Sequence, residues 1–193
     1  MRHSVCDDHR MDSLVAAGLG LDYADLRFER TTDAWLVAGA GLRDWVADIL
    51  RDLPTSVELI GSSSVLGLLA KPIIDLAVGT DSNASNVDVK SRLALAGWIY
   101  RGDAGTKGGE VFVLESEPQY RVAHLHIVER DDVQWSNYLR LRDLLRGSAV
   151  ARDRYEAVKL SLSAQAPMDR ETYTLGKTDI ITQLLAGMDQ SVV

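Results

Sequence analysis

The central part of the chain, from about residue 55 to residue 130, is rich in short apolar segments that predict β-strands. SVELIG alternates polar and apolar positions, and IIDLAVG is a nearly continuous apolar run. Such a run is typical of a strand that is covered on both faces, so we expect it at the centre of a sheet. Three further strands are predicted by WIYRG, EVFVLES and YRVAHLHIVE, the last two antiparallel and joined by a short loop at Pro118.

Apolar residues at helical spacing predict helices on both sides of this region. Residues 31–54 form one such segment, which Asp33 can cap and which stops before Pro54. Residues 83–97 predict a second helix. Between two of the predicted strands, SSSVLGLLA opens with three serines that can serve as caps and predicts a short helix. From Trp135 onward, three successive segments have the pattern of helices.

These elements predict a protein of the α/β (α+β) class, with a mixed β-sheet of about five strands, flanking helices and a C-terminal helical tail. Residues 1–30 have a weak apolar period, which indicates a weakly ordered N-terminal extension. We expect the sheet domain over residues 31–130 and a helical region packed on it over residues 131–193.

Composition and charge narrow the class of protein. The 193 residues carry a formal net charge of −7, which argues against a broad electrostatic footprint for DNA or RNA. Cys6 is the single cysteine, so the sequence has no internal disulfide and fits a reducing compartment. Its surroundings lack the apolar core of a signal peptide, and LVAAGLGL is too short to span a bilayer. We therefore expect a cytoplasmic protein without membrane contact.

Asp75 stands inside the apolar run, where a carboxylate is costly unless it is paired, hydrogen-bonded or bound to a metal. No neighbour in the sequence can pair with it, which favours a ligand role. Gly61 and Ser62 lie between a predicted strand and a predicted helix, where backbone N–H groups and a hydroxyl suit phosphate. Asp75 on the next strand could then hold Mg²⁺ that bridges phosphate oxygens. The alternative is that the serines only cap a helix and Asp75 is a satisfied buried acid.

The segment IGSSSVLGLLAKPIIDLAV resembles the signature of the GrpB family, also known as UPF0157, which reads approximately IGSTSVPGLAAKPIIDI. The likeness continues in the family's order, over about residues 31–186, through GWIYR, HLHIVE, WSNYLRLRDLLR, ARDRYEAVKLSL and YTLGKTDII. This family is similar to the nucleotidyltransferase superfamily. The resemblance implies a nucleotidyltransferase-like mixed sheet and an enzyme that uses a nucleoside triphosphate, ATP by analogy, with Mg²⁺. It leaves the acceptor undefined.

The resemblance also assigns roles to residues and reveals one departure. It implies that Gly61, Ser62 and Ser63 bind the nucleotide phosphates. Asp75 becomes the metal ligand. The second metal carboxylate belongs two residues later on the same strand face, where this chain has Ala77. Two-metal chemistry needs paired carboxylates, so a Mg²⁺-dependent transferase and a non-catalytic nucleotide- or ligand-binding domain with a degenerate metal site both stay open.

Two histidines and a lysine extend the candidate site. His124 and His126 share a face of their predicted strand, and with Asp75 they could form a two-histidine, one-carboxylate metal site. Two hydrogen-bonded histidines on a half-buried face are the alternative. His126 could instead act as a general base, and Lys71 could neutralise charge that develops on a phosphate. The expected catalytic residues are therefore Asp75, His126 and Lys71.

Side chains from the C-terminal helices complete the expected phosphate site. Arg142 lies in a row of arginines, whose guanidinium groups suit phosphate, although most charged rows on helices are solvated faces. Lys159, Tyr173 and Lys177 match positions of the family's motifs and are expected to line the cleft. The expected partners are a nucleotide and an unidentified small-molecule acceptor, with RNA less favoured and DNA not expected. A tRNA- or CoA-linked biosynthetic enzyme is a further alternative.

Overall fold

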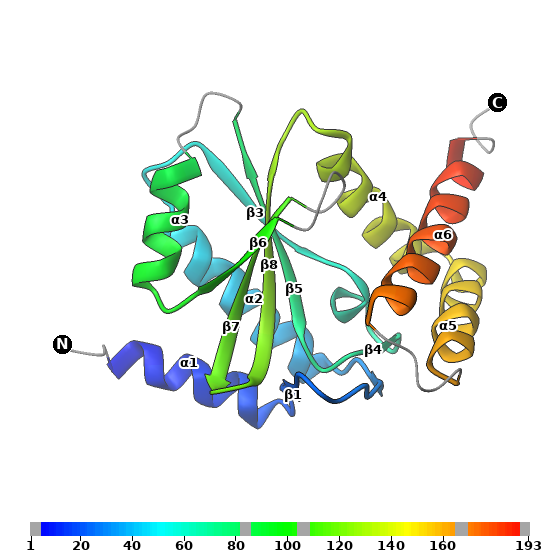
Figure 1. The fold of residues 1–193 in the computed structure, drawn as a ribbon, viewed down its shortest axis with the longest axis horizontal. Helices are drawn as coiled ribbons and strands as arrows, with labels where there is room; N and C mark the ends of the chain where they lie inside the picture. The colour runs from blue at the N-terminus through cyan, green and yellow to red at the C-terminus, as the bar shows by residue number, and fades with distance from the viewer. Residues whose placement is uncertain (1–4, 82–85, 104–108, 165–169, 190–193) are drawn as a thin grey trace.

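The computed structural model describes residues 5–81, 86–103, 109–164 and 170–189 (Figure 1). Within these ranges the helices are α1 (Val5–Ala16), α2 (Asp33–Ile49), α3 (Asn86–Leu95), α4 (Val133–Gly147), α5 (Ala149–Ala164) and α6 (Arg170–Asp189). The strands are β1 (Leu21–Asp22), β2 (Glu29–Arg30), β3 (Thr55–Ile60), β4 (Leu69–Ala70), β5 (Ile74–Thr80), β6 (Ile99–Asp103), β7 (Glu110–Glu117) and β8 (Tyr120–Glu129). A 3-10 turn, η1 (Ser62–Ser64), follows β3. None of the described helices is long and apolar enough to cross a membrane.

Six of the described strands form one mixed sheet in the order β3-β5-β8-β7-β6, with β1 paired to the start of β8. β5 and β8 run parallel, and the other neighbouring pairs run antiparallel. β2 and β4 form a separate two-stranded sheet. The predicted α/β class with a mixed sheet is confirmed, and the apolar run that contains Asp75 is the interior strand β5. The strands β1, β2 and β4 have two residues each, too few to produce a period in the sequence.

One face of the sheet forms the main hydrophobic core. Ile74, Leu76 and Val78 alternate along β5 onto this face and are fully buried. Helices α1, α2 and α3 cover the face with apolar side chains, such as Trp35 from α2. The intervening residues of β5 therefore project from the opposite face, and Asp75 is one of them.

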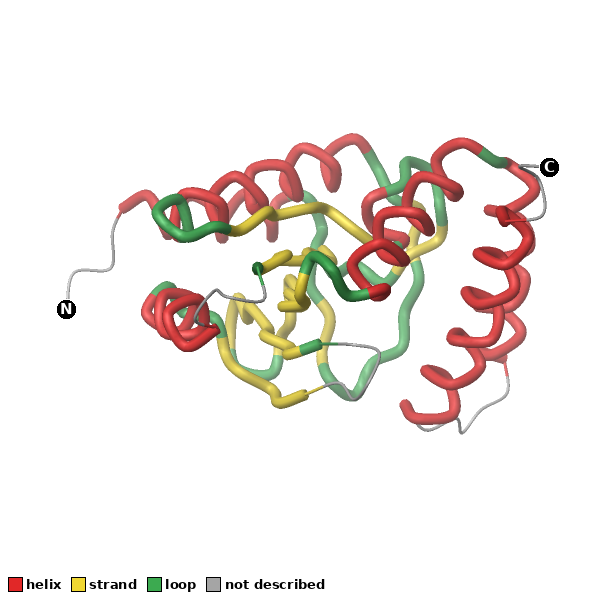
Figure 2. Tube along the Cα trace, turned by 90° about the horizontal axis from the view of Figure 1, so that it is seen from above, coloured by secondary structure: helices red, strands yellow, loops and turns green. Residues whose placement is uncertain are grey.

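The C-terminal helices have a second core of their own. It consists of Val65, Leu68, Leu141, Leu145, Ala151, Tyr155, Ile180, Leu184 and Leu185. Figure 1 shows α4, α5 and α6 together at one end of the molecule, apart from α1, α2 and α3. Viewed from above, helices lie along one side of the strands and at both ends of the molecule (Figure 2). Since Val65 and Leu68 belong to the loop between β3 and β5, this loop fastens the helical region to the sheet.

Residues 10–30 differ from the expectation of a weakly ordered extension. Three leucines of this segment are almost fully buried: Leu14 in α1, Leu19 in the turn after it, and Leu21 in β1. Leu14 and Leu19 belong to the main core. β1 pairs with β8 in the register Leu21↔Arg121. The apolar residues that hold this segment are spread over a helix end, a turn and a short strand, so they produce no single period in the sequence.

The segment after Gly61 also differs from the prediction of a short helix. Residues Ser62–Ser64 form one 3-10 turn, and the chain continues as a loop into β4. The backbone of the loop forms hydrogen bonds with Thr31 instead of within a helix. The N–H of Gly67 donates to the carbonyl of Thr31 at 2.9 Å, and the N–H of Thr31 donates to the carbonyl of Leu68 at 3.0 Å. A turn of three residues offers no helix dipole to a phosphate.

Helix α2 forms where the sequence predicts it, but its cap is a different residue. Thr32, not Asp33, is the N-cap, because Thr32 Oγ1 accepts a hydrogen bond from the N–H of Trp35 at 3.4 Å. Asp33 lies in the first turn, where its negative charge interacts favourably with the positive end of the helix dipole.

Candidate functional site

Asp75 contacts a residue of the neighbouring strand β8 and not a residue of its own strand β5. The parallel pairing of β5 and β8 places it opposite His124, and Asp75 Oδ1 lies 3.4 Å from His124 Nδ1. Burial raises the pKa of Asp75, but the hydrogen bond and charge of His124 outweigh burial. Lys177 and His126 add to this effect, so the pKa of the carboxyl group lies below its usual value. The carboxylate is therefore ionised at neutral pH.

The turn at Gly61 brings the backbone against this carboxylate. Gly61 has φ +67, and a Cβ atom at this position would lie 2.7 Å from Asp75 Oδ2. Ser63 Oγ accepts a hydrogen bond from the N–H of Asp75 at 3.1 Å. Ser64 Oγ donates to the carbonyl of Gly61 at 2.8 Å. Ser63 and Ser64 thus fix the turn on β5, whereas Ser62 reaches the cavity described below.

Lys159 reaches the same turn from α5. The residue is 2 % exposed, and its Nζ donates to Ser62 Oγ at 3.1 Å and to the carbonyl of Leu69. Burial, with a further contribution from Lys177, lowers the pKa of Lys159 to about 7, although Asp75 acts in the opposite direction. At neutral pH a sizeable fraction of this amine is uncharged, and an approaching anion would draw a proton onto it.

A cavity of about 560 Å³, the first cavity below, lies over this group of side chains. The predicted site residues that line it are Ser62, Lys71, Asp75, His124, His126, Lys159 and Lys177. Tyr23, Arg101 and Arg121 also line it and were not predicted. Five of the lining residues are lysine or arginine and one is acidic, in a chain of net charge −7. Such a site favours a polyanion.

Arg101 and Arg121 reach the cavity because the strand pairing is irregular. In the β6–β7 pair the register shifts and leaves Arg101 as the extra residue. In the β7–β8 pair a second shift pairs Arg121 with Glu115 and brings Arg121 to the face of His124. Strict alternation along YRVAHLHIVE would put residues 121 and 124 on opposite faces, so the pattern holds no signal for Arg121.

Tyr23 fastens the N-terminal segment to this end of the cavity. Its hydroxyl donates to Glu115 Oε1 at 2.8 Å and accepts from Arg101 at 2.9 Å. The guanidinium group of Arg121 lies 4.3 Å from the centre of the Tyr23 ring. Glu115 compensates Arg101, with 2.8 Å between the charged groups. Glu115 thus offsets part of the positive charge at this end of the cavity.

A second cavity of about 450 Å³ lies between the sheet and helices α4 and α6. It shares Asp75, His126 and Lys177 with the first cavity, so the two cavities meet at these side chains. Its other lining residues are mostly uncharged and include Gln134, Asn137 and Thr178. The hydroxyl of Tyr155 is buried at this cavity with no hydrogen-bond partner among the described residues. A ligand could satisfy it.

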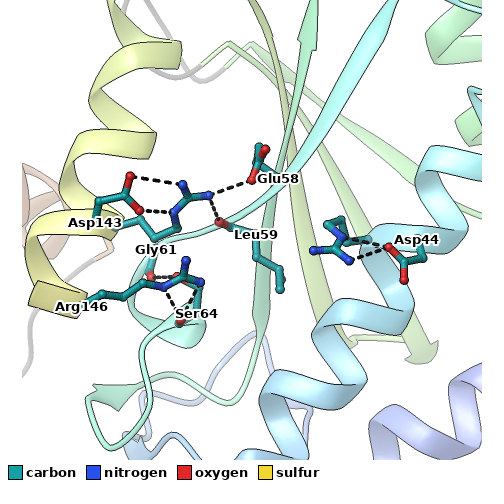
Figure 3. Close-up of polar contacts among 9 residues, drawn as sticks. Asp44, Glu58, Leu59, Gly61, Ser64, Asp143 and Arg146 are labelled. Carbon is teal, nitrogen blue, oxygen red and sulfur yellow. Dashed lines mark hydrogen bonds and ion pairs between the residues drawn. The ribbon is translucent and has the colours of Figure 1, made fainter.

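Arg142 is held within the protein. Its guanidinium group donates to Glu58 Oε2 at 2.8 Å and to Asp143 Oδ1 at 2.8 Å (Figure 3). Arg146 donates to the carbonyl of Ser64 at 3.1 Å. These contacts fasten α4 to β3 and to the turn after it, and neither arginine belongs to the lining of the two cavities. The expected contact of Arg142 with phosphate gains no support from this arrangement.

The remaining expected site residue is Tyr173. It lies on α6, outside the residues whose side chains the structure describes, so its expected role stays a prediction. Lys177, one turn further along the helix, lines both cavities.

Residues 26–186 match the family described as GrpB protein. This chain belongs to the GrpB family. It is 29% identical over 144 residues to the glutamate-rich protein GrpB of Alkalihalophilus pseudofirmus, which covers 72% of this chain and 82% of that protein. It is 36% identical over 132 residues to a UPF0157 protein of Streptomyces coelicolor, which covers 65% of this chain and 64% of that protein. The chain thus spans less than two thirds of the length of this second relative.

Solved structures confirm the fold of this GrpB family member. GrpB from Enterococcus faecalis matches it with a TM-score of 0.69 at 26% identity, over 84% of this chain and 99% of that chain. The Cid1 poly(U) polymerase matches it with a TM-score of 0.50 at 16% identity, over 82% of this chain and 47% of that chain. At such low identity the second likeness concerns the fold alone. The fold is nucleotidyltransferase-like, as the resemblance implies.

The donor set does not fit the pair of Mg²⁺ ions used in two-metal phosphoryl transfer. The position of the second carboxylate is Ala77, whose neighbours across the sheet are Glu58 on β3 and His126 on β8. Glu58 is held in an ion pair with α4. In the part of the chain that the structure describes, no three His, Cys, Asp or Glu side chains gather closely enough to hold a metal ion. Asp75, His124 and His126 share a cavity but do not converge as a ligand set.

Proposed function

We propose that this GrpB family member binds a nucleotide, with its phosphate groups in the first cavity. The observation that carries the proposal is the composition of that cavity: five lysine and arginine side chains and one carboxylate, which already lies 3.4 Å from His124 Nδ1. Ammonium groups and a serine hydroxyl are donors that phosphate oxygens accept. Lys159 and Ser62, which bond to each other in the free protein, would both turn to the phosphate.

The second cavity is suited to the nucleoside part of the ligand. It joins the first cavity at Asp75, His126 and Lys177, so a ligand that fills both would pass these side chains. Asn137 and the buried hydroxyl of Tyr155 are polar groups of the kind that bond to the edge of a base. The solved Cid1 poly(U) polymerase has Mg 3'-dATP bound, and by analogy of fold this makes adenine nucleotides the first ligands to test.

Calorimetry with ATP, GTP, CTP and UTP tests this proposal. We expect at least one nucleoside triphosphate to bind, and the matching nucleoside to bind much more weakly because it lacks phosphate. Lys71→Met should weaken binding by removing a charge from the cavity. Lys90→Met is the matched control, since Lys90 is paired with Glu110 at 3.0 Å outside the cavity. Failure of all four nucleotides to bind would contradict the proposal.

A second candidate function is transfer of the nucleotidyl group to an unidentified small-molecule acceptor. It is favoured by His126, which lines both cavities beside Asp75 and could take a proton there. The acceptor oxygen would bond to the α-phosphorus, its proton would pass to His126, and pyrophosphate would leave. Lys71 and Lys177 would stabilise the charge on the leaving group. Release of pyrophosphate with a panel of acceptors supports this function, and binding without release would assign the chain to the binding class.

A further inference from the structure

We propose that Lys159 and Lys177 take the place of a divalent cation in the first cavity, so that the cavity binds the metal-free nucleotide in preference to its magnesium complex. This inference rests on the proposed function and specifies whether the nucleotide binds with or without its magnesium ion. Three features support it: the contacts of the Asp75 carboxylate, the loss of the second carboxylate, and the placement of the two lysines.

Both carboxylate oxygens of Asp75 already lie against protein groups. Oδ1 is 3.4 Å from His124 Nδ1, and Oδ2 faces the turn at Gly61, where a Cβ atom would approach it to 2.7 Å. Mg²⁺ binds oxygen at about 2.0–2.1 Å in near-octahedral geometry and gives up its water reluctantly. A cation could reach Asp75 only from the cavity side, where 25% of the side chain is exposed, and it would have to share the carboxylate with His124.

Among the described residues, the other carboxylates on this face of the sheet are already engaged, and Glu115 is bound to Tyr23 and Arg101. Ala77, which follows Asp75 on the same face, is fully buried. Glu58 lies opposite Ala77 on β3, but its carboxylate is bound to Arg142 at 2.8 Å. A single carboxylate with a histidine beside it attracts a divalent cation far less than a pair of free carboxylates does.

The two lysines lie where positive charge would meet the phosphates. Lys177 lines both cavities at their junction with Asp75. Lys159 is buried at the wall of the first cavity and bonded to Ser62. Cationic side chains repel Mg²⁺ and attract phosphate oxygens, and a nucleotide without its metal carries the larger negative charge. The lysines therefore compete with the metal instead of cooperating with it.

Calorimetry of ATP binding to the full chain, at matched ionic strength with either EDTA or excess MgCl₂, tests the inference. We expect ATP in EDTA to bind at least about threefold more tightly than Mg-ATP, because the lysines face the larger charge. Equal or tighter binding with magnesium would overturn the inference and leave the proposed function in place. Absence of binding in both conditions, for GTP, CTP and UTP as well as ATP, would overturn the proposed function itself.

Lys177→Met provides a second readout. Lys177 is half-buried on α6, so we expect the variant to fold, which thermal melting checks. Its affinity for ATP in EDTA should fall by about tenfold and its affinity for Mg-ATP by less, so that the preference disappears. Lys177→Arg, which keeps the charge, should retain the preference, and Lys90→Met should leave it unchanged. An equal loss with and without magnesium in Lys177→Met would overturn the inference.

Discussion

The Nζ atom of Lys159 lies 3.1 Å from the Oγ atom of Ser62, although 97 positions separate the two residues in the sequence. Ser62 belongs to the turn by which the chain leaves β3, and Lys159 belongs to α5 in the helical region. This hydrogen bond therefore joins the two parts of the chain at the wall of the first cavity. A ligand that replaces it contacts both parts at once.

Replacing Lys159 by methionine should weaken the binding of metal-free ATP by about 10- to 100-fold, because a charge-assisted hydrogen bond to phosphate is lost. Methionine keeps most of the buried apolar stem, so we expect the fold to hold. Calorimetry measures the change, and Lys90→Met is the control because it removes an equal charge from a pair with Glu110. Unchanged affinity would show that Lys159 serves only to hold Ser62 and Leu69 together.

The same lysine predicts that nucleotide binding takes up a proton. Burial lowers the pKa of Lys159 to about 7, and the neighbouring Lys177 and Lys71 act in the same direction. Asp75 and Glu156 act against them. At pH 8 this amine is mostly uncharged in the free protein, and a bound polyanion raises its pKa, so up to about one proton is taken up. Binding should therefore strengthen as the pH falls from about 9 to about 7.

Calorimetry in HEPES and in Tris, whose ionisation enthalpies differ, measures this uptake. We expect different apparent binding enthalpies in the two buffers for the natural chain, and nearly equal enthalpies for Lys159→Met. Equal enthalpies for the natural chain would contradict the titration of Lys159.

Much of the fold follows from local patterns, and the site follows from them only in part. The alternation in SVELIG and the apolar run around Asp75 predict β3 and β5 because each pattern lies within one element. The sequence predicts that Asp75, His124 and His126 lie at one site, but not the direct contact of Asp75 with His124. This contact depends on the parallel register of β5 and β8, which are distant in the chain, and the apolar pattern restricts that register only to shifts of two residues.

Other features of the site depend on tertiary contacts in the same way. Arg121 reaches the cavity through a register shift that no alternation reveals. The turn after Gly61 stays a 3-10 turn because the loop backbone bonds to Thr31 instead of extending a helix. Lys159 is indicated by resemblance to a family motif, but its burial becomes visible only when α5 packs against η1.

Asp75→Asn should destabilise the fold and strengthen the binding of metal-free ATP. Asparagine cannot keep the charge-assisted contact with His124, which should lower the free energy of unfolding at pH 7 by about 1–2 kcal/mol. Burial raises the pKa of Asp75 but His124 outweighs it, so the pKa is lowered. The contribution of the contact is therefore present above about pH 4 and is lost as the pH falls below that value. Urea unfolding at pH 7 and pH 3 measures it.

The same variant separates the two roles first considered for Asp75. The loss of one negative charge from the cavity should tighten ATP binding in EDTA. A metal ligand would behave in the opposite way: the free protein would be as stable as before or more stable, and Mg²⁺-dependent nucleotide binding would be lost.

Arg142→Met should reduce stability without changing the affinity for ligands. The Arg142 side chain is 13% exposed and binds Glu58 at 2.8 Å, so its loss should lower the free energy of unfolding by about 1–3 kcal/mol. Arg154→Met, which removes an equal charge from an exposed position on α5, is the control for stability. ATP affinity and retention of RNA at low salt should stay the same. A salt-sensitive loss of RNA retention in Arg142→Met alone would instead support an RNA partner.

Gly61→Ala should disturb the site itself, and Gly67→Ala is its matched control. Both glycines have positive φ, +67 and +76, and Gly61 combines it with ψ −172, a region essentially restricted to glycine where an alanine costs roughly 1–3 kcal/mol. At Gly67 a Cβ atom would meet nothing within 4 Å, so the only cost of the substitution is the backbone strain. At Gly61 it would lie 2.7 Å from Asp75 Oδ2 and push the carboxylate from its place beside His124. Gly61→Ala should therefore unfold at a lower urea concentration than Gly67→Ala, and it alone should change the affinity for ATP. If the two variants match in both stability and affinity, the close approach of Gly61 to Asp75 does not shape the cavity.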